Sequence, residues 1–283
     1  MFDLELLVCP ADKKQLESHA DYLQCTHCSE KYKVEHGIPV FYVSEDWENQ
    51  YITDENYYAA EEPFSIEGDT PYLDLRDNND YGVVLDLGSG DGVYASSASK
   101  DVKVYCLDVT PTGLRRIFKR NMDNLIPICA SGFELPFEDE SIDTILYVFV
   151  VEHLEKGLDL KMMQEAKRVL KKDTGRMIYT TDTPFFDRYL VRWTNLLLRG
   201  KLTVQDHVSD TGHINLLTME QSRQLIGKSG FDIVSEEPII FGARFNVWKK
   251  IIKLIKHIMP ISIFENFLTS KYAFIVKVKQ DSE

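Results

Sequence analysis

A short glycine-rich stretch contains the residues of this sequence best suited to binding a charged ligand. Gly88, Gly90 and Gly92 directly follow the apolar run Val83–Leu87. Glycines at the end of a strand let the backbone turn sharply and approach a ligand closely, and the first N–H groups of a following helix carry a partial positive charge. The pattern therefore predicts a strand, a ligand-binding turn and a helix over Val93–Ser99.

The spacing within this loop distinguishes between classes of ligand. A dinucleotide fingerprint would place its third glycine at residue 93, whereas this chain has Gly92, and no Gly-Lys-Ser/Thr of a P-loop follows. Asp86, just before the loop, would repel a pyrophosphate but suits an ammonium group. Asp108, at the end of the next apolar run, is placed to accept hydrogen bonds from both hydroxyls of a ribose. The alternative role for Asp108 is to cap a helix beginning at Pro111.

Apolar runs alternate with helical patterns from residue 83 onward, and near-continuous apolar strands separated by helices indicate a buried, mostly parallel sheet. The fold class is therefore α/β. We expect strands at Val83–Leu87, Val102–Leu107, Leu125–Cys129, Thr144–Val148, Arg176–Thr180, Phe231–Ser235 and Tyr272–Val278, and helices at Val93–Ser99, Pro111–Arg120, Leu158–Leu170, Phe185–Leu198, Thr218–Ser229 and Val247–Met259.

The N-terminal residues 1–45 read as a separate small β unit. Strands are expected at Tyr22–Cys25, Lys31–Val34 and Val40–Val43, with a turn at His36–Pro39. Residues 46–81 are expected to form an acidic connector with some helix. Residues 82–283 form the main domain, with insertions at about 184–210 and 243–270.

Charge and composition restrict the class of partner. The net charge of -13 argues against non-specific binding to nucleic acid, which depends on Lys and Arg neutralising phosphates. The sequence shows no secretion signal and no run of about 18 apolar residues. Three of the five cysteines cluster near the N-terminus, which is typical of a reduced protein with a metal site. We therefore expect a cytoplasmic location.

Four ordered motifs carry a resemblance to a known family: LDLGSGDG, LDVTP, LPFEDESIDTILYVFVVEHLE and EAKRVLKKDTGRMIYTT. They resemble class I S-adenosylmethionine-dependent methyltransferases of the UbiE/UbiG-like, type 11 group, strongly over residues 82–182 and more weakly in GHINLLTMEQSRQLIGKSGF. The resemblance implies a Rossmann-like, doubly wound fold with a mostly parallel seven-stranded sheet. It also implies an enzyme that uses S-adenosylmethionine and releases S-adenosylhomocysteine.

The same resemblance assigns cofactor-binding residues one by one. The methionine part is held by one group of residues, the ribose by a second, and the adenine by a third, where Ser131 stands in place of the aspartate that family members often carry. The implied residues are Asp86, Gly88, Ser89 and Gly90 for the methionine part, Asp108 and Val109 for the ribose, Ser131, Gly132 and Phe133 for the adenine, and Tyr147 beside the cofactor.

Two histidines are candidates for the acceptor side. If the methyl acceptor is a hydroxyl, a base near the methyl group assists the reaction. His153 follows the fourth strand of the main domain, and His213 matches a histidine that often borders the acceptor pocket in related sequences. The alternative for each is a loop or helix-start histidine with a structural hydrogen bond. No motif of a hydrolase is present.

The segment LLVCPADKKQLE…LQCTHCSEKYKVEHGIPVF resembles the Trm112-like zinc-ribbon family. In that family, two Cys-x-x-Cys knuckles bring four thiolates around zinc. Here the second knuckle, Cys25 and Cys28, is intact, whereas the first pairs Cys9 with Asp12. A carboxylate can ligate zinc, so one interpretation is a site of three cysteines and Asp12. The other is a ribbon that folds around its apolar residues without metal.

Two basic, apolar segments bear on the acceptor. Residues 185–201 and 245–259 combine Lys and Arg with Trp and long aliphatic side chains. Such segments fit helices that lie on an anionic membrane, and equally a lid with a solvated basic face. The primary hypothesis is a methyltransferase for a small or lipid-linked acceptor at O or N. The alternatives are an RNA methyltransferase and a non-catalytic binding module.

Overall fold

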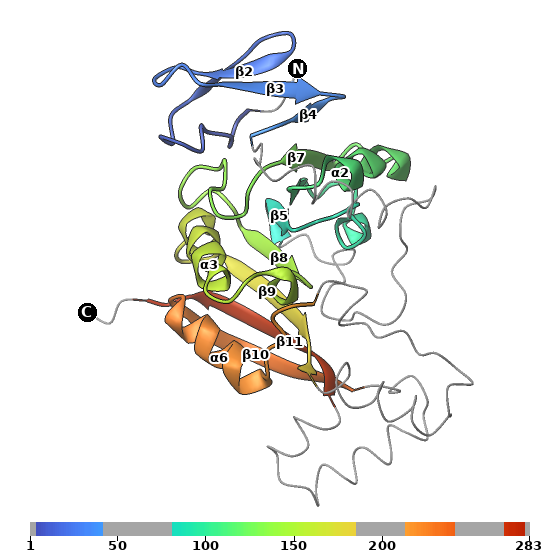
Figure 1. Ribbon diagram of the computed structural model, residues 1–283, viewed down its shortest axis with the longest axis vertical. Coiled ribbons are helices and arrows are strands. Elements are labelled where there is room, and N and C mark those ends of the chain that lie inside the picture. The colour runs from blue at the N-terminus through green and yellow to red at the C-terminus, as the bar shows by residue number, and fades with distance from the viewer. Residues whose placement is uncertain (1–3, 42–80, 185–212, 241–268, 281–283) are drawn as a thin grey trace, which may run out of the picture. The chain divides into compact units, whose positions relative to one another are not determined.

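The computed structural model describes residues 4–41, 81–184, 213–240 and 269–280 of the 283-residue chain (Figure 1). Its main sheet has seven strands in the order β10-β11-β9-β8-β5-β6-β7, and a smaller sheet has the order β1-β2-β3-β4. The expected α/β, Rossmann-like class with a small N-terminal β unit is confirmed. The strands of the main sheet are β5 (Val84–Leu87), β6 (Val104–Asp108), β7 (Leu125–Cys129), β8 (Thr144–Val148), β9 (Arg176–Asp182), β10 (Phe231–Ile240) and β11 (Thr269–Val278).

The chain divides into two compact units. One comprises Met1–Val148, Lys161–Ile178 and Lys277–Glu283, and the other comprises Phe149–Leu160 and Tyr179–Val276. In the first unit, β5 pairs in parallel with both β6 and β8, and β6 pairs in parallel with β7. All four residues of β5 and all five of β8 are buried, which explains why these strands are mostly apolar without alternation.

Among the described residues, the helices agree with the sequence expectations except at one place. The described helices are α2 (Pro111–Ile117), the 3₁₀ turns η4 (Phe118–Arg120) and η5 (Val151–His153), α3 (Leu158–Val169) and α6 (Met219–Lys228), which begins with a capping box from Thr218 to Gln221. The helix expected over Val93–Ser99 is wrong, since only the 3₁₀ turn η3 (Ala95–Ser97) forms there. Ser96 and Ser97 donate their hydroxyl hydrogens to the carbonyls of Val93 and Tyr94, and such local bonds compete with a regular helix.

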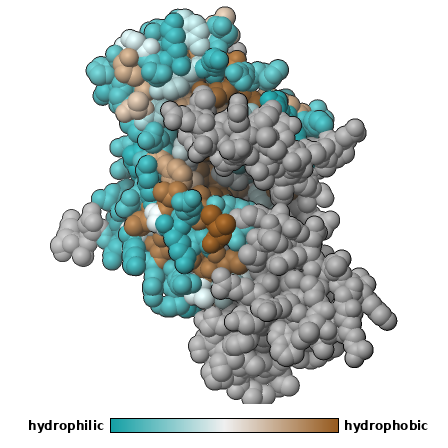
Figure 2. Space-filling view, in the orientation of Figure 1, coloured by the Kyte–Doolittle hydropathy of each residue, from teal (hydrophilic) through white to brown (hydrophobic). Residues whose placement is uncertain are grey.

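The N-terminal sheet consists of β1 (Leu16–Ser18), β2 (Tyr22–Cys25), β3 (Lys31–Glu35) and β4 (Ile38–Pro39), paired antiparallel in that order. The strand expected over Val40–Val43 is instead β4 at Ile38–Pro39, because His36 and Gly37 alone make the turn expected over His36–Pro39, with φ values of 51° and 81°. In β3, Lys31, Lys33 and Glu35 are exposed while Tyr32 is buried. This alternation gives the N-terminal sheet a mostly hydrophilic outer face (Figure 2).

Within the first unit, hydrogen bonds join the N-terminal residues to the end of β7 and to the loop that follows it. Phe41 donates its N–H to the carbonyl of Cys129 at the end of β7, at 2.8 Å. Val8 donates its N–H to the carbonyl of Pro136 at 3.0 Å, and the Lys13 ammonium reaches the carbonyl of Leu135 at 3.2 Å. Both ends of the loop that follows β7 are therefore held by N-terminal residues.

Several sequence expectations lie outside the described residues. These are the connector over 46–80, the helices at Phe185–Leu198 and Val247–Met259, and thus both basic segments. Among the helices within the described ranges, none has the length and apolar character needed to cross a membrane.

Candidate functional site

The glycine loop wraps around the end of the neighbouring strand. Gly88 and Ser89 both donate their N–H groups to the carbonyl of Leu107 in β6, at 2.8 and 2.9 Å. Gly88 and Gly90 have φ values of 79° and 54°, a left-handed region that side chains with a Cβ rarely adopt. The Oγ of Ser89 is buried and has no hydrogen-bond partner among the described residues. The loop thus presents a polar atom that a ligand would satisfy.

The Asp108 carboxylate is oriented toward this loop by three hydrogen bonds. One oxygen accepts from the N–H of Gly90 at 2.8 Å, and the other accepts from both the N–H and the hydroxyl of Thr110. The N-cap residue of α2 is Thr110, so Asp108 does not occupy the capping position. A carboxylate held at a strand end beside a glycine turn is placed to accept from ribose hydroxyls.

Asp86 lies beneath the loop and is almost completely buried, with 1% of its surface exposed. It accepts the N–H of Ala95 at 3.2 Å. Burial raises the pKa of this carboxyl to about 7, the Ala95 N–H opposes the rise, and the negative Asp108 adds to it. A nearby cation would favour the ionised form, which is the property expected of a group that receives the ammonium of a methionine.

Asp91, within the same loop, was not recognised from the sequence. It is buried and pairs with Arg120 at 2.9 Å and with Arg116 at 4.0 Å, while Arg120 also donates to the Asp91 carbonyl at 2.7 Å. These contacts fasten the glycine loop to α2 and η4. The separation of 29 positions along the chain gives no local signal for such a pair.

The residues implied for the adenine follow β7. The Ser131 hydroxyl accepts the N–H of Phe133 at 3.2 Å. A Cβ at Gly132 would lie 2.5 Å from the terminal methyl of Met162, so glycine allows α3 to pack closely here. Tyr147 is fully buried in β8, and the Val109 carbonyl faces the Cys129 thiol. All candidate cofactor residues therefore belong to the first unit.

The two candidate histidines belong to the second unit, and the structure brings them together. The rings of His153 and His213 lie edge to face with centroids 4.9 Å apart. The Glu152 carbonyl accepts the N–H groups of Ile214 and Asn215, at 2.8 and 3.0 Å. These bonds tie the segment that carries His213 to the turn that carries His153.

Glu152 is a second residue that the sequence reasoning missed. Its side chain is completely buried, and one carboxyl oxygen accepts from the Thr181 hydroxyl at 3.2 Å. The other oxygen has no hydrogen-bond partner within the part of the chain that the structure describes. Burial, reinforced by Asp182, raises the pKa of the carboxyl to about 8. Because Glu152 directly precedes the candidate His153 in the sequence, the two could have been assigned to one site.

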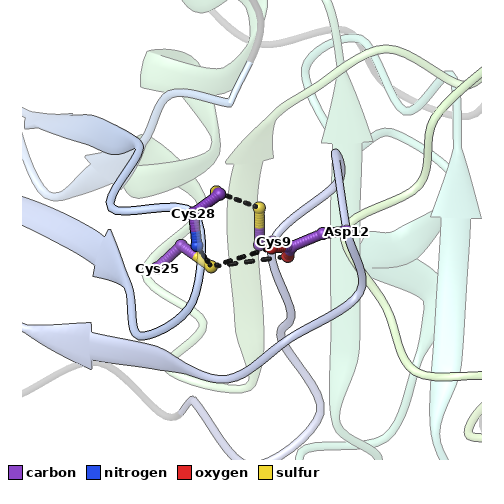
Figure 3. Close-up of side chains that lie close together, drawn as sticks. All are labelled: Cys9, Asp12, Cys25 and Cys28. Carbon is purple, nitrogen blue, oxygen red and sulfur yellow. Dashed lines mark hydrogen bonds between the residues drawn. The ribbon is translucent and has the colours of Figure 1, made fainter.

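The four metal-ligand candidates of the N-terminal unit converge in space (Figure 3). The sulfur atoms of Cys9 and Cys28 lie 3.7 Å apart, and Cys25 lies 3.4 Å from a carboxyl oxygen of Asp12. Zinc–sulfur bonds of about 2.3 Å place two sulfurs about 3.8 Å apart in a tetrahedral site. The His27 ring nitrogen bonds the Asp12 carboxylate at 2.9 Å. The donors fit a zinc ion in number, spacing and chemical type.

Comparison with known proteins matches the centre of the main sheet. Residues 85–178 match the family model of a methyltransferase domain. This stretch is similar to a methyltransferase domain. It contains the glycine loop, Asp108, the residues Ser131–Phe133 that follow β7, and the turn carrying Glu152 and His153. The UbiE/UbiG-like subgroup and the Trm112-like character of residues 1–45 remain predictions.

Individual proteins are similar to this chain, one in sequence and two in fold. An uncharacterized protein of Methanocaldococcus jannaschii is 33% identical over 96 residues, which are 34% of this chain and 39% of that protein. The cyclase SpnF has a TM-score of 0.55 at 16% identity, covering 87% of this chain and all of that chain. Phosphoethanolamine N-methyltransferase 2 of Haemonchus contortus, in complex with S-adenosyl-L-methionine, has a TM-score of 0.53 at 18% identity over 86% of this chain and 62% of that one. The two structures support the fold.

Proposed function

We propose that the protein transfers the methyl group of S-adenosylmethionine to a small or lipid-linked acceptor at oxygen or nitrogen. The observation that carries this proposal is the Asp108 carboxylate, held against the N–H of Gly90 at 2.8 Å in the matched domain. A ribose-binding carboxylate beside a glycine turn suits a nucleoside cofactor. The absence of a third glycine at residue 93 and the presence of Asp86 favour a cofactor with an ammonium over a dinucleotide.

Each candidate cofactor-binding residue has a defined role in this proposal. S-adenosylmethionine supplies an electrophilic methyl group on its sulfonium. Asp86 and Gly88–Gly90 hold the methionine part, Asp108 holds the ribose, and Ser131–Phe133 with Tyr147 enclose the adenosine. Positioning and exclusion of water supply much of the acceleration of methyl transfer, so these residues act mainly by holding the cofactor in place.

His153 and His213 serve the acceptor side. Their contact, and the two backbone hydrogen bonds to the Glu152 carbonyl, hold both rings in one place. From there the imidazoles bind the acceptor and favour loss of the proton from a hydroxyl or amine. Sequence alone offers each histidine separately, whereas their proximity supports a shared role.

Two measurements test the function. Calorimetric titration with S-adenosylmethionine tests the cofactor, and no binding by the folded protein would overturn the proposal. Methyl-labelled cofactor is then incubated with the protein and a small-molecule extract, a lipid extract or total RNA. We expect label in the first or second fraction. Label in RNA alone would favour an RNA methyltransferase, and cofactor binding without transfer to any fraction would favour a binding module.

Asp86 predicts a pH dependence of cofactor affinity. Because its pKa is raised to about 7, the carboxyl is largely neutral below that pH and cannot attract the methionine ammonium. The affinity for S-adenosylmethionine should therefore rise by about fivefold between about pH 6 and pH 7, and the rise should level off at higher pH, where the cofactor's own amino group begins to deprotonate. Calorimetry across this range measures the effect. Asp86→Asn should flatten the curve, and an equally steep curve in that variant would contradict the assignment.

The same group affects the free protein with the opposite sign. The pKa of Asp86 is higher in the folded than in the unfolded chain, so its contribution to the free energy of unfolding is present at low pH. That contribution is lost as the pH rises through about 7. Bound cofactor should offset the loss, because its ammonium stabilises the ionised carboxylate.

For the N-terminal unit we propose a structural zinc ion held by Cys9, Asp12, Cys25 and Cys28. The 3.7 Å spacing of two sulfurs and the His27–Asp12 hydrogen bond support this. Metal analysis should find about one zinc ion per chain fewer in Cys25→Ser than in the wild type. The melting temperature of that variant should fall by several degrees, as expected for about 2 kcal/mol. Cys106→Ala, which removes a buried thiol outside the cluster, should keep its zinc. A zinc-free wild type that unfolds at the same temperature with and without a chelator would contradict the site.

A further inference from the structure

A second group of potential ligands lies outside both the glycine loop and the thiol cluster. We propose that Glu152, His153 and His213 bind a divalent transition-metal cation. A ligand atom from each of the three residues lies within 4.8 Å of the others. Bonds of about 2.0–2.2 Å to nitrogen and carboxylate oxygen place two ligands of one ion about 3–4 Å apart. Small side-chain rotations are therefore sufficient to bring the three atoms onto one ion.

The backbone holds the three ligands together without any ion. Glu152 and His153 are neighbours on the 3₁₀ turn η5, and the carbonyl of Glu152 accepts the N–H groups of Ile214 and Asn215, directly after His213. The Asn215 side chain in turn donates to Asp159 at 3.1 Å. A site whose ligands are already in place loses little conformational freedom when a cation binds.

The buried carboxylate supplies the independent observation for a cation. The Glu152 side chain is completely buried, and one of its oxygens has no partner among the described residues. Its other oxygen accepts from the neutral Thr181 hydroxyl. The ionised form of a buried carboxyl is strongly unfavourable without a compensating charge, and a divalent cation between it and two imidazoles would provide that charge.

The donor set indicates the class of cation. Two imidazoles and one carboxylate are the ligands of open transition-metal sites, which leave coordination positions for further molecules. Here the proposal rests on the proposed methyltransferase function. An acceptor oxygen or nitrogen bound at an open position would be held in place, and a hydroxyl bound to the cation would lose its proton more readily. The histidines then act on the acceptor as ligands of the cation.

Cobalt(II) titration of the full chain, without an affinity tag, tests the site. Cobalt bound to thiolates shows intense sulfur-to-metal charge-transfer absorption, whereas cobalt bound by imidazole and carboxylate shows only weak ligand-field bands. In a Cys25→Ser, Cys28→Ser double variant, we expect one equivalent of cobalt with ligand-field bands alone. Because that variant could fail to fold, manganese(II) titration of the unmodified chain, followed by electron paramagnetic resonance, is the second measurement, since manganese favours oxygen and nitrogen over sulfur.

Single substitutions locate the bound ion. His153→Ala, His213→Ala and Glu152→Gln should each weaken manganese binding at least about tenfold. His19→Ala removes an exposed histidine that stacks on Tyr22, and it should bind manganese as the wild type does. Unchanged binding in the three site variants, or no binding at about 1 mM cation, would overturn the proposal.

The outcome is separable from that of the methyltransferase proposal. Titration with S-adenosylmethionine does not depend on this cation, so cofactor binding with no manganese binding would overturn only the metal site. Manganese binding with no cofactor binding would overturn only the methyltransferase function. Methyl transfer that persists in full after chelation would retain the site but remove its role toward the acceptor.

Discussion

Replacing Asp108 by alanine should weaken the binding of S-adenosylmethionine by at least about 100-fold, because two charge-assisted hydrogen bonds to the ribose are lost and each contributes about 1.5–3 kcal/mol. The same change removes the acceptor of the Gly90 and Thr110 N–H groups, so the glycine loop also loses its preformed shape. Asp108→Asn keeps one accepting oxygen and should fall between alanine and the wild type. Isothermal titration with the cofactor and with S-adenosylhomocysteine measures both.

The control for this prediction is a carboxylate of the same unit that lies away from the loop. Asp123 is exposed, and Asp123→Asn should leave the affinity unchanged. Circular dichroism and a thermal melt of each variant separate loss of binding from loss of fold. If folded Asp108→Ala protein binds the cofactor like the wild type, then Asp108 does not hold the ribose and the central observation of the proposed function fails.

The glycine loop was the part of the candidate site most easily predicted from the sequence. Its residues are close in the chain, and each follows from a local requirement: positive φ at Gly88 and Gly90, and a carboxylate at the end of the next strand. The strands predicted at Leu125–Cys129 and Thr144–Val148 match β7 and β8 at both ends, since buried parallel strands carry continuous apolar runs bounded by polar residues.

Contacts between distant residues were not predictable in this way. The pairing of Asp91 with Arg120 and the hydrogen bonds of Glu152 to Ile214 and Asn215 depend on tertiary placement. The helix expected over Val93–Ser99 failed for a different reason, because two serine hydroxyls there bond to nearby carbonyls. The Asp91 pair and the serine bonds depend on polar side chains, whereas the bonds to Glu152 join backbone groups.

In the N-terminal unit, too, some features were predictable from the sequence and others were not. Its four candidate ligands were predicted from the resemblance to the zinc-ribbon family, and they converge. Its attachment to the loop after β7, through Val8, Lys13 and Phe41, uses backbone carbonyls that leave no trace in the sequence. Because Val8 and Lys13 flank the Cys9–Asp12 knuckle, the order of this knuckle and the order of the loop that follows β7 are physically connected.

Replacing His213 or His153 by alanine should lower the rate of methyl transfer by about 10²–10⁴-fold while leaving the affinity for S-adenosylmethionine within about twofold of the wild type. The reason is that both rings belong to the second unit with Glu152, whereas every candidate cofactor residue lies in the first. The readout is the initial rate of label transfer into whichever extract fraction accepts it, with cofactor affinity measured in parallel.

The double variant makes this prediction sharper. Residues that act as one unit show losses that do not multiply, so His153→Ala with His213→Ala should be about as slow as the slower single variant. Two independent histidines would instead give the product of the two losses. His19→Ala, an exposed histidine of the N-terminal sheet unit, should transfer methyl groups at the wild-type rate. Full activity in both single variants would place the acceptor elsewhere, and a loss of cofactor affinity equal to the loss of rate would reassign the pair to cofactor binding.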